Sequence, residues 1–277
     1  MVYSSEISRR NPGCIVFLLD QSGSMNDQLP DGNTKATGAA DAINRLLQEL
    51  ILKCTKEDGV RNYFDIGIIG YGSSEGFAGP IVGQGFTELS SLAAHPLRIE
   101  SRLKKEPDGA GGIIESNVKF PIWFEPVSAA DTPMCQALGM CNNWIEDWTK
   151  NHSNAFPPIV FNITDGEATD GDPESIANNI KNVSTSDGNT LLFNCHISGT
   201  GGTAILFPSS ESELPSDPLA RKLFRMSSTL PEAILQLAQK ESFTVSETSR
   251  GFAFNADLVH LIRFLDIGTQ VSREQLR

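Results

Sequence analysis

The sequence lacks any long hydrophobic run, and this absence excludes the first large class of proteins. No apolar stretch approaches the roughly 20 residues that a helix needs to cross a bilayer, and the first thirteen residues are polar and include Arg9 and Arg10. No signal-peptide core precedes the first apolar segment, which runs directly into acidic and hydroxyl residues. The sequence therefore predicts a cytoplasmic protein that does not enter a membrane.

Cysteine is scarce and poorly placed for a zinc site or a disulfide framework. The five cysteines are an odd number, and none forms a Cys-x-x-Cys pair. Each falls in or beside an apolar, periodic segment, which is typical of a buried free thiol. We therefore expect free and buried thiols at Cys14, Cys54, Cys135, Cys141 and Cys195.

Positive charge is also in short supply. The chain has 22 Lys and Arg residues against 34 Asp and Glu residues, which gives a formal net charge of -12. A surface of this charge repels the phosphates of nucleic acids and of anionic lipids. The composition therefore argues against nucleic acid and membrane as partners, whereas cations and basic protein surfaces are compatible with it.

The chain is organised around residues 14–25. Six apolar residues are followed by Asp20, Ser22, Gly23 and Ser24. A short apolar run bounded by turn residues is typical of a strand buried on both faces, and ligands of open α/β sheets bind just beyond the carboxyl ends of such strands. A tight turn at the glycine would direct the three oxygen-bearing side chains towards one point. Three hard oxygen donors predict a hard divalent cation.

Strand and helix patterns alternate along the rest of the chain. Apolar residues at i, i+3, i+4 and i+7 mark amphipathic helices between short apolar strands. The predicted strands are 14–19, 63–71, 158–165, 191–197 (continued or paired by 204–207) and 251–254, and the predicted helices are 36–51, 133–148, 173–183, 217–226, 232–240 and 257–265. This alternation predicts an α/β fold with a Rossmann-like, doubly wound and mostly parallel central sheet flanked by helices. We expect a single domain over 1–277 with its core at 13–265.

The segment 72–126 interrupts the alternation. It is rich in glycine and proline and has no helical period of any length. Residues 97–103 and 118–124 predict the strands of an inserted β-hairpin, with its turn at 107–112. Its basic residues are Arg98, Arg102, Lys104, Lys105 and Lys119. A solvated hairpin is the favoured interpretation, and an insertion that contacts a partner is the alternative.

Oxygen-bearing side chains recur at three points of one predicted sheet edge. Asp20, Ser22 and Ser24 follow one apolar strand, Asp165 follows another, and Thr132 stands at a helix start. Any one of them alone could be a turn hydroxyl, a helix cap or a loop acid. Together they offer two carboxylates and three hydroxyls without His or Cys, a set that suits Mg²⁺ or Mn²⁺ better than Zn²⁺. The five residues therefore predict one metal site.

A second acidic cluster lies nearby and comprises Glu167, Asp170, Asp172 and Glu174. An accessory Ca²⁺ loop is one interpretation, but the ligand spacing of an EF-hand is missing. Helix capping already explains Asp172 and Glu174, so it is the favoured interpretation.

The three parts of the predicted metal site also carry a resemblance to a known family. The run Asp20-Gln21-Ser22-Gly23-Ser24 resembles the DxSxS motif of von Willebrand factor A (VWA) domains. Thr132-Pro133-Met134, followed by Ala137-Leu138, is similar to the second element of that family, and Thr164-Asp165-Gly166-Glu167 is similar to the third. Together these elements form the metal-ion-dependent adhesion site (MIDAS) of VWA domains. The chain resembles bacterial intracellular members near tellurite-resistance-type stress and conflict systems.

The resemblance implies a role for each residue. Ser22 and Ser24 would bind the metal directly, Thr132 would join them when a ligand is engaged, and Asp20 and Asp165 would hold it mainly through water. The implied metal is Mg²⁺ or Mn²⁺ in preference to Ca²⁺. The remaining coordination position would take an Asp or Glu carboxylate of another protein, so the implied function is a non-enzymatic, metal-dependent adaptor or scaffold module. The segment 72–126 departs from the family pattern.

Two other functions stay open at this point. The first is a metal-assisted phosphatase or hydrolase with Asp20 as nucleophile. Three features count against it. A serine stands two residues after Asp20, where an acid would be wanted, and no G-x-S-x-G motif is present. No histidine pairs with a nucleophile in a motif; the four histidines are His95, His152, His196 and His260. The second is a scaffold subunit whose metal is purely structural.

Overall fold

The structure is a computed structural model that describes residues 3–72, 85–107, 113–129, 131–198 and 202–274. A seven-stranded sheet forms its centre. In spatial order the strands are β12 (Ile205–Leu206), β13 (Phe252–Ala256), β11 (Leu191–Ile197), β8 (Ile159–Thr164), β1 (Gly13–Gln21), β4 (Phe64–Gly72) and β5 (Phe86–Glu88). Neighbouring strands from β13 to β4 are parallel, and the short edge strands β12 and β5 are antiparallel to theirs. The predicted α/β fold with a mostly parallel sheet is confirmed.

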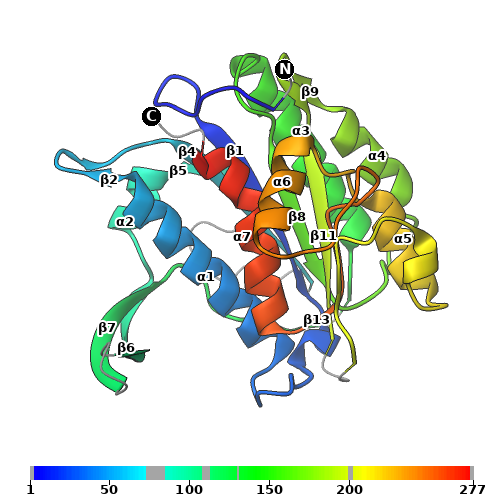
Figure 1. The fold of residues 1–277 in the computed structure, drawn as a ribbon, viewed down its shortest axis with the longest axis horizontal. Helices are drawn as coiled ribbons and strands as arrows, with labels where there is room; N and C mark the ends of the chain where they lie inside the picture. Colours follow the sequence, from blue (N-terminus) through cyan, green and yellow to red (C-terminus); the bar gives the residue numbers. More distant parts are fainter. Residues whose placement is uncertain (1–2, 73–84, 108–112, 130, 199–201, 275–277) are drawn as a thin grey trace.

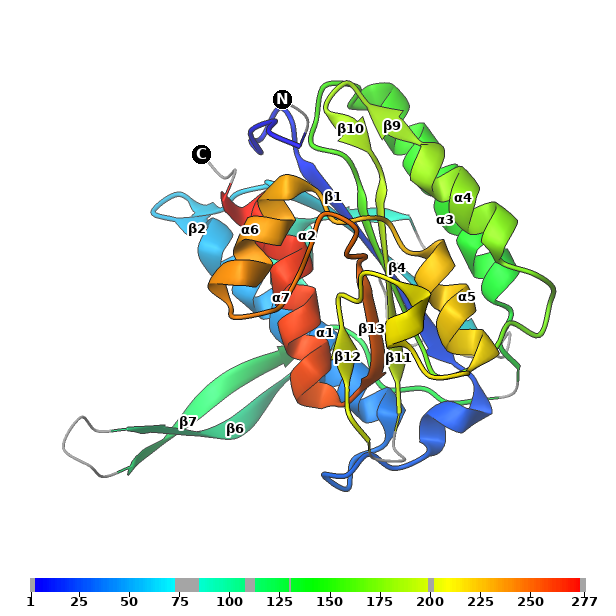
Figure 2. The same ribbon diagram turned by 45° about the vertical axis from the view of Figure 1, so that its right-hand side comes forward.

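Helices cover both faces of this sheet (Figures 1 and 2). One face carries α1 (Lys35–Cys54), α2 (Leu89–Ala94), α6 (Glu232–Lys240) and α7 (Leu258–Glu274). The other carries α3 (Met134–Asn151), α4 (Glu174–Asn182) and α5 (Pro218–Met226). No helix in the described part of the chain has the length and apolar character needed to span a membrane.

The central strand β1 shows why the sheet needs two helical layers. All nine of its residues are buried, and successive side chains of a strand point to opposite faces. Ile15 and Phe17 therefore pack in the core under α1 and α7, while Val16 and Leu18 pack in the core under α3 to α5. A strand with apolar residues on both faces is stable only between two apolar layers.

Helix starts follow the predicted chemistry with small shifts. The side chain of Thr34 accepts a hydrogen bond from the backbone nitrogen of Thr37 at 3.1 Å and so caps α1. In α3 the predicted first residue, Pro133, is the N-cap, and the helix begins one residue later at Met134.

The segment 72–126 departs from prediction in two respects. It contains the short helix α2, whose Leu89 and Leu92 are buried, and β5 joins the central sheet beside β4. The side chain of Trp123 is also buried and donates to the carbonyl oxygen of Leu92 at 2.7 Å. The ends of this segment therefore belong to the core, because their apolar side chains cover an edge of the sheet that would otherwise face water.

The predicted hairpin is present within this segment as β6 (Arg98–Pro107) and β7 (Ile113–Ile122). Figure 2 shows it projecting away from the body of the molecule. Of its predicted turn at 107–112, residues 108–112 lie outside the described residues. Arg98 pairs with Glu100 and Glu125, and Arg102 pairs with Asp41 and Glu100. Neighbouring acids thus neutralise much of the predicted basic character.

The remaining elements are short. The predicted strand near 204–207 forms β12, but it pairs with β13 and not with β11. Two 3₁₀ turns are η1 (Gly23–Asn26) and η2 (Glu211–Glu213). Two further hairpins are formed by β2 (Thr55–Lys56) with β3 (Gly59–Val60), and by β9 (Ser184–Thr185) with β10 (Gly188–Asn189). No cysteine is in a disulfide; four thiols are buried as predicted, and that of Cys135 is half-buried.

Candidate metal centre

The carboxyl ends of β1 and β8 bring the two predicted carboxylates to one edge of the sheet. The strands are parallel and in register, with Leu19 opposite Ile163, so Asp20 and Asp165 leave them side by side. Thr164, the last residue of β8, donates its hydroxyl to Asp20 Oδ2 at 2.6 Å. This bond ties the two strand ends together directly beneath the predicted site.

The two serines complete a hydrogen-bonded cluster with these acids. The backbone nitrogen of Ser22 donates to Asp20 Oδ1 at 2.8 Å, and η1 then turns the chain back on itself. The hydroxyls of Ser22 and Ser24 lie 3.1 Å apart, and that of Ser24 donates to Asp165 Oδ1 at 2.8 Å. Four of the five predicted residues are therefore in one cluster, as the spacing of the motif predicts.

Thr132 lies beside this cluster rather than within it. Its backbone nitrogen donates to Thr169 Oγ1 at 3.1 Å, and its carbonyl accepts from the backbone nitrogen of Thr169 at 2.9 Å. A Cβ built on Gly166 would lie 4.0 Å from Thr132 Oγ1, which places the hydroxyl against the loop that follows Asp165. In the part of the chain that the structure describes, no hydrogen bond joins the Thr132 hydroxyl to the other four side chains.

Asp170 holds the start of α3 against the same loop, and its role was not predicted. Its two carboxylate oxygens accept from the backbone nitrogens of Cys135 and Gln136 at 3.0 and 2.8 Å. These are unpaired donors of the first helical turn, where a negative charge is also favoured by the helix dipole. Asp170 thereby fixes the distance between Thr132 and the loop after β8.

The spacing of the oxygens matches what a small divalent cation requires. Ligands about 2.0–2.1 Å from Mg²⁺ at right angles to each other are about 3 Å apart. The gaps from Ser22 Oγ to Ser24 Oγ and from Ser24 Oγ to Asp165 Oδ1 are 3.1 and 2.8 Å. Among the described residues, no three His, Cys, Asp or Glu side chains gather as a metal-binding group. The donor set that fits Mg²⁺ thus depends on hydroxyls together with the two carboxylates.

Asp20 is buried, with 3% of its surface exposed. Burial raises its pKa above the ordinary value, and hydrogen bonds from Ser22 and Thr164 partly offset this effect. The negative charge of Asp165 nearby also raises the pKa. A cation at this position would relieve the unfavourable burial of the Asp20 charge.

Lys35 is a charged residue at the centre that sequence analysis missed. Its ammonium donates to Asp165 Oδ2 at 2.8 Å and to Asp27 Oδ2 at 3.1 Å. Burial lowers the pKa of Lys35, but the hydrogen bonds and charges of the two aspartates outweigh it, so the pKa is raised overall. One sequence signal was available, because a lysine in the first turn of a helix opposes the helix dipole and needs a compensating partner.

An open hollow of about 540 Å³ lies beside Asp165 and Lys35. Its far wall contains His196, whose ring stacks on that of Phe254 with centroids 4.8 Å apart, and Asp217, which caps α5. Burial lowers the pKa of His196, so the imidazole is neutral near pH 7. Of the five predicted site residues, Asp165 is the one that lines this hollow, whereas Ser24, which is exposed, lies outside its lining.

The second acidic cluster is accounted for by contacts within the protein. Asp170 caps α3 as described, Asp172 accepts from the backbone nitrogen of Glu174 at 3.3 Å, and Glu174 pairs with Arg225 at 2.5 Å. Asp172 also lies 3.7 Å from Lys222. The predicted N-cap at Asp172 is shifted, because Pro173 is the N-cap of α4 and the helix begins at Glu174. Contacts within the protein thus engage Asp170, Asp172 and Glu174.

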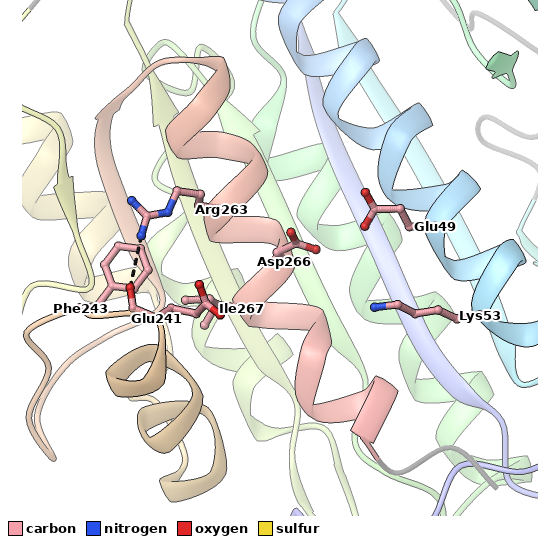
Figure 3. Close-up of a pocket in the computed structure, with 7 residues that line it drawn as sticks. All are labelled: Glu49, Lys53, Glu241, Phe243, Arg263, Asp266 and Ile267. Atoms are coloured by element: carbon pink, nitrogen blue, oxygen red, sulfur yellow. Dashed lines mark hydrogen bonds between the residues drawn. The ribbon is translucent and has the colours of Figure 1, made fainter. Parts of the chain in front are cut away.

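A second, smaller hollow of about 210 Å³ lies between α1, α7 and the segment after α6 (Figure 3). Its Arg263 donates to the carbonyl oxygen of Glu241 at 3.3 Å and lies over the ring of Phe243. The wall on α1 includes Lys53, which is about 27 Å along the helix from Lys35 at 1.5 Å per residue. This hollow is therefore separate from the candidate metal centre.

Comparisons with known proteins add little to these observations. No family model and no curated protein sequence matches the chain. Among solved structures, it is similar to the adhesive tip pilin GBS104 from Group B Streptococcus agalactiae, with 16% sequence identity and a TM-score of 0.28. The similarity covers 57% of this chain and 46% of the pilin chain, so this chain spans less than half of the pilin's length. A likeness of this degree carries no argument about function.

Proposed function

We propose that this chain is a VWA-type, metal-dependent protein-binding module that captures a partner's Asp or Glu carboxylate at a Mg²⁺ or Mn²⁺ ion. Ser22 and Ser24 would bind the ion directly, Thr132 would join them when the carboxylate is engaged, and Asp20 and Asp165 would hold the ion mainly through water. The resemblance to intracellular members extends the proposal to a cytoplasmic adaptor in a bacterial stress or conflict system, with neither nucleic acid nor membrane as partner.

One observation carries this proposal. The oxygens of Ser22, Ser24 and Asp165 follow one another at 3.1 and 2.8 Å on the carboxyl edge of a parallel sheet, and this edge is where open α/β sheets bind ligands. Hard oxygen donors at such separations suit Mg²⁺. Ser24 is exposed, so another molecule can reach the cluster from solvent, and a hollow lies beside Asp165.

The charge of the donor set favours a carboxylate as the last ligand. Hydroxyl ligands are neutral, so a divalent cation held partly by them keeps positive charge that an incoming anion can balance. Mg²⁺ also retains exchangeable water, which leaves a position for that anion. The chain's own residues would supply the orientation, with the Thr164 bond to Asp20 and the Asp170 cap of α3 holding the two sides of the site in place.

The geometry of Asp20 counts against the alternative of a phosphatase or hydrolase. Both of its carboxylate oxygens accept hydrogen bonds, one from the backbone of Ser22 and one from Thr164. A nucleophile needs an oxygen that can reach the substrate, whereas this side chain is buried. Hydrolysis of p-nitrophenyl phosphate with Mg²⁺ that is lost in Asp20→Asn would favour the enzyme instead.

The metal part of the proposal is tested by calorimetric titration of the full chain with Mg²⁺ and Mn²⁺. We expect one ion per chain, with affinity lowered by about 10–100-fold in Ser22→Ala and in Ser24→Ala. Ser101→Ala, which removes an exposed hydroxyl on β6, is the matched control and should bind like wild type. Equal affinity in all four proteins would contradict the assignment.

The partner part is tested by capture from a cell lysate on the immobilised chain. Capture should require Mg²⁺, disappear in EDTA and fail with Thr132→Ala. It should also fail when the carboxylates of the lysate proteins are first converted to amides, because the proposed contact is a carboxylate on the metal. A protein retained equally in EDTA, or after amidation, would exclude this mode of capture. If metal removal lowers only thermal stability and leaves capture unchanged, the metal is structural.

A further inference from the structure

Lys35 already provides a cation at the candidate metal centre. Its ammonium is within hydrogen-bond distance of three oxygens, namely Asp165 Oδ2 at 2.8 Å, Asp27 Oδ2 at 3.1 Å and the carbonyl oxygen of Ser24 at 3.5 Å. An ammonium has three hydrogens to donate, so this oxygen set can satisfy all of them. Ser24 belongs to the serine motif, Asp27 follows it, and Asp165 is one of the proposed metal-site acids.

The position of this ammonium is firmly determined. Lys35 is only 8% exposed although it is the first residue of α1, and its backbone nitrogen donates to the carbonyl oxygen of Asp27 at 2.9 Å. The side chain of Asp165 is fully buried. A buried carboxylate and its cationic partner cannot separate without leaving an uncompensated charge, so the pair persists unless another cation replaces the ammonium.

Both oxygens of Asp165 are therefore engaged, Oδ1 by Ser24 and Oδ2 by Lys35. A divalent ion that uses Asp165 must either displace the ammonium or bind beside it. Repulsion between the two cations weakens binding in either case. A carboxylate that binds the divalent ion would offset this repulsion, because it places a negative charge beside the two cations.

We propose that Lys35 is a tethered counter-ion that weakens metal binding in the free chain and couples tight metal binding to the arrival of a carboxylate. This inference rests on the proposed function, since it assigns the regulation of the same site. Lys35 acts on the metal through its charge and through Asp165, and is thus a positioning residue rather than a ligand.

The test compares Mn²⁺ affinity in wild type, Lys35→Met and Lys35→Gln by calorimetry. Lys35→Gln keeps a donor for Asp165 without the charge, and it serves if Lys35→Met fails to fold. Lys222→Met is the matched control, because it removes one positive charge from a lysine next to Asp172 in the neighbouring loop. We expect about tenfold tighter binding in the two Lys35 variants and a change below about threefold in the control.

A second measurement adds acetate at constant ionic strength. Acetate should tighten Mn²⁺ binding to wild type and have a smaller effect on Lys35→Gln, because that variant lacks the ammonium whose repulsion the carboxylate offsets. Equal or weaker metal binding in a folded Lys35 variant would overturn the counter-ion role while leaving the proposed function intact.

The remaining outcomes separate the two proposals. Binding in Lys35→Gln but not in wild type would support the counter-ion role and contradict a metal-loaded wild-type centre. Absence of binding in every variant would overturn both.

Discussion

Asp20 is the residue at which the stability of the fold and the proposed function oppose each other. Its carboxylate is buried at the end of the central strand, and its pKa is raised chiefly by that burial. A raised carboxylate pKa means that the folded chain holds the charged form less readily than the unfolded chain, so the charge reduces stability above the unfolded pKa. This loss of stability persists at neutral pH unless a cation binds near the Asp20 carboxylate.

Asp20→Asn should therefore stabilise the metal-free protein while removing metal binding. The amide keeps the size of the side chain and removes the buried charge. We expect the thermal midpoint in EDTA to rise, by about 2–4 °C for each kcal/mol gained in a chain of this size. The midpoint of wild type should rise with Mg²⁺ and that of the variant should not. A lower midpoint for the variant in EDTA would show that the hydrogen bonds of Asp20 outweigh its desolvation.

His196 makes stability depend on pH with the opposite sign to Asp20. Its protonation favours the unfolded chain, whereas protonation of Asp20 favours the folded chain. Burial lowers its pKa from the ordinary value of 6.5, so below that value the unfolded chain takes up a proton that the folded chain resists. The free energy of unfolding should be flat above about pH 7.5 and should fall as the pH drops through 6.5, by at most about 1.4 kcal/mol per pH unit for one group. Denaturant unfolding at several pH values measures this slope.

His196→Gln should reduce that slope between pH 7 and pH 5.5, because the variant removes the titrating group. His95→Gln, at an exposed position, is the matched control and should keep the wild-type slope. Identical slopes in wild type and His196→Gln would assign the pH dependence to other groups.

At the scale of secondary-structure elements, a buried row of polar side chains runs from β4 across β1 to β8 and β11 and reaches the end of α5. Tyr71 donates to Asn162 Oδ1 at 2.7 Å, Asn162 donates to Asn194 Oδ1 at 2.9 Å, and Asn194 donates to Ser227 Oγ at 2.9 Å. Burial, and then the nearby charge of Asp20, raise the pKa of Tyr71 well above its usual value, so its hydroxyl stays protonated and can donate. The row lies on the same face of the sheet as α3, whose start carries Thr132.

Asn162→Leu should lower the free energy of unfolding by about 2–4 kcal/mol, since it leaves the partners on both sides unpaired at about 1–3 kcal/mol each. Tyr71→Phe should cost less. The double variant should lose less than the sum of the two, by about 0.5–3 kcal/mol, because the second change removes a partner that is already unpaired. Urea unfolding of all four proteins gives this cycle, and strictly additive losses would contradict a connected row.

At the scale of the whole molecule, the chain is a three-layered α/β/α body with one projecting hairpin. The near end of the hairpin belongs to the body, where Arg102 lies over the ring of Phe120 at 3.8 Å and pairs with Asp41. The exposed side chains of Ile99, near the base, and of Leu103, further out, contribute no core packing. A two-stranded ribbon on its own is marginally stable, so the outer half depends on the inner half and not the reverse.

Excision of residues 104–116, with Leu103 joined to Asn117 through an Asn-Gly turn, should therefore leave the body intact. We expect a change below about 1 kcal/mol in stability, which is about 2–4 °C in the thermal midpoint, and unchanged Mg²⁺ binding. Trp123→Ala, at the base of the same segment, should cost about 3–5 kcal/mol because a fully buried ring is removed. Loss of the fold on excision would show that the hairpin is structurally required.

The sequence alone determined the elements and the donor set. Local patterns mark the strands with apolar residues on both faces, the amphipathic helices and the cap at Thr34. Each pattern follows from burial or hydrogen bonding within a few residues. The grouping of Asp20, Ser22, Ser24 and Asp165 was predictable as well, because the carboxyl ends of neighbouring parallel strands must meet at one edge. Metal binding by this group remains a prediction.

Only the tertiary structure decided which other residues complete the candidate metal centre at the carboxyl edge of the sheet. The contact between Lys35 and Asp165 joins residues 130 positions apart, and that between Asp170 and the start of α3 depends on how two loops meet. The pairing of β12 with β13 and the entry of β5 into the sheet are of the same kind. Periodicity shows which face of an element is buried, but not which residue of another element lies opposite it. That choice is made by packing across the whole molecule, and here it placed an ammonium where a metal ion is expected.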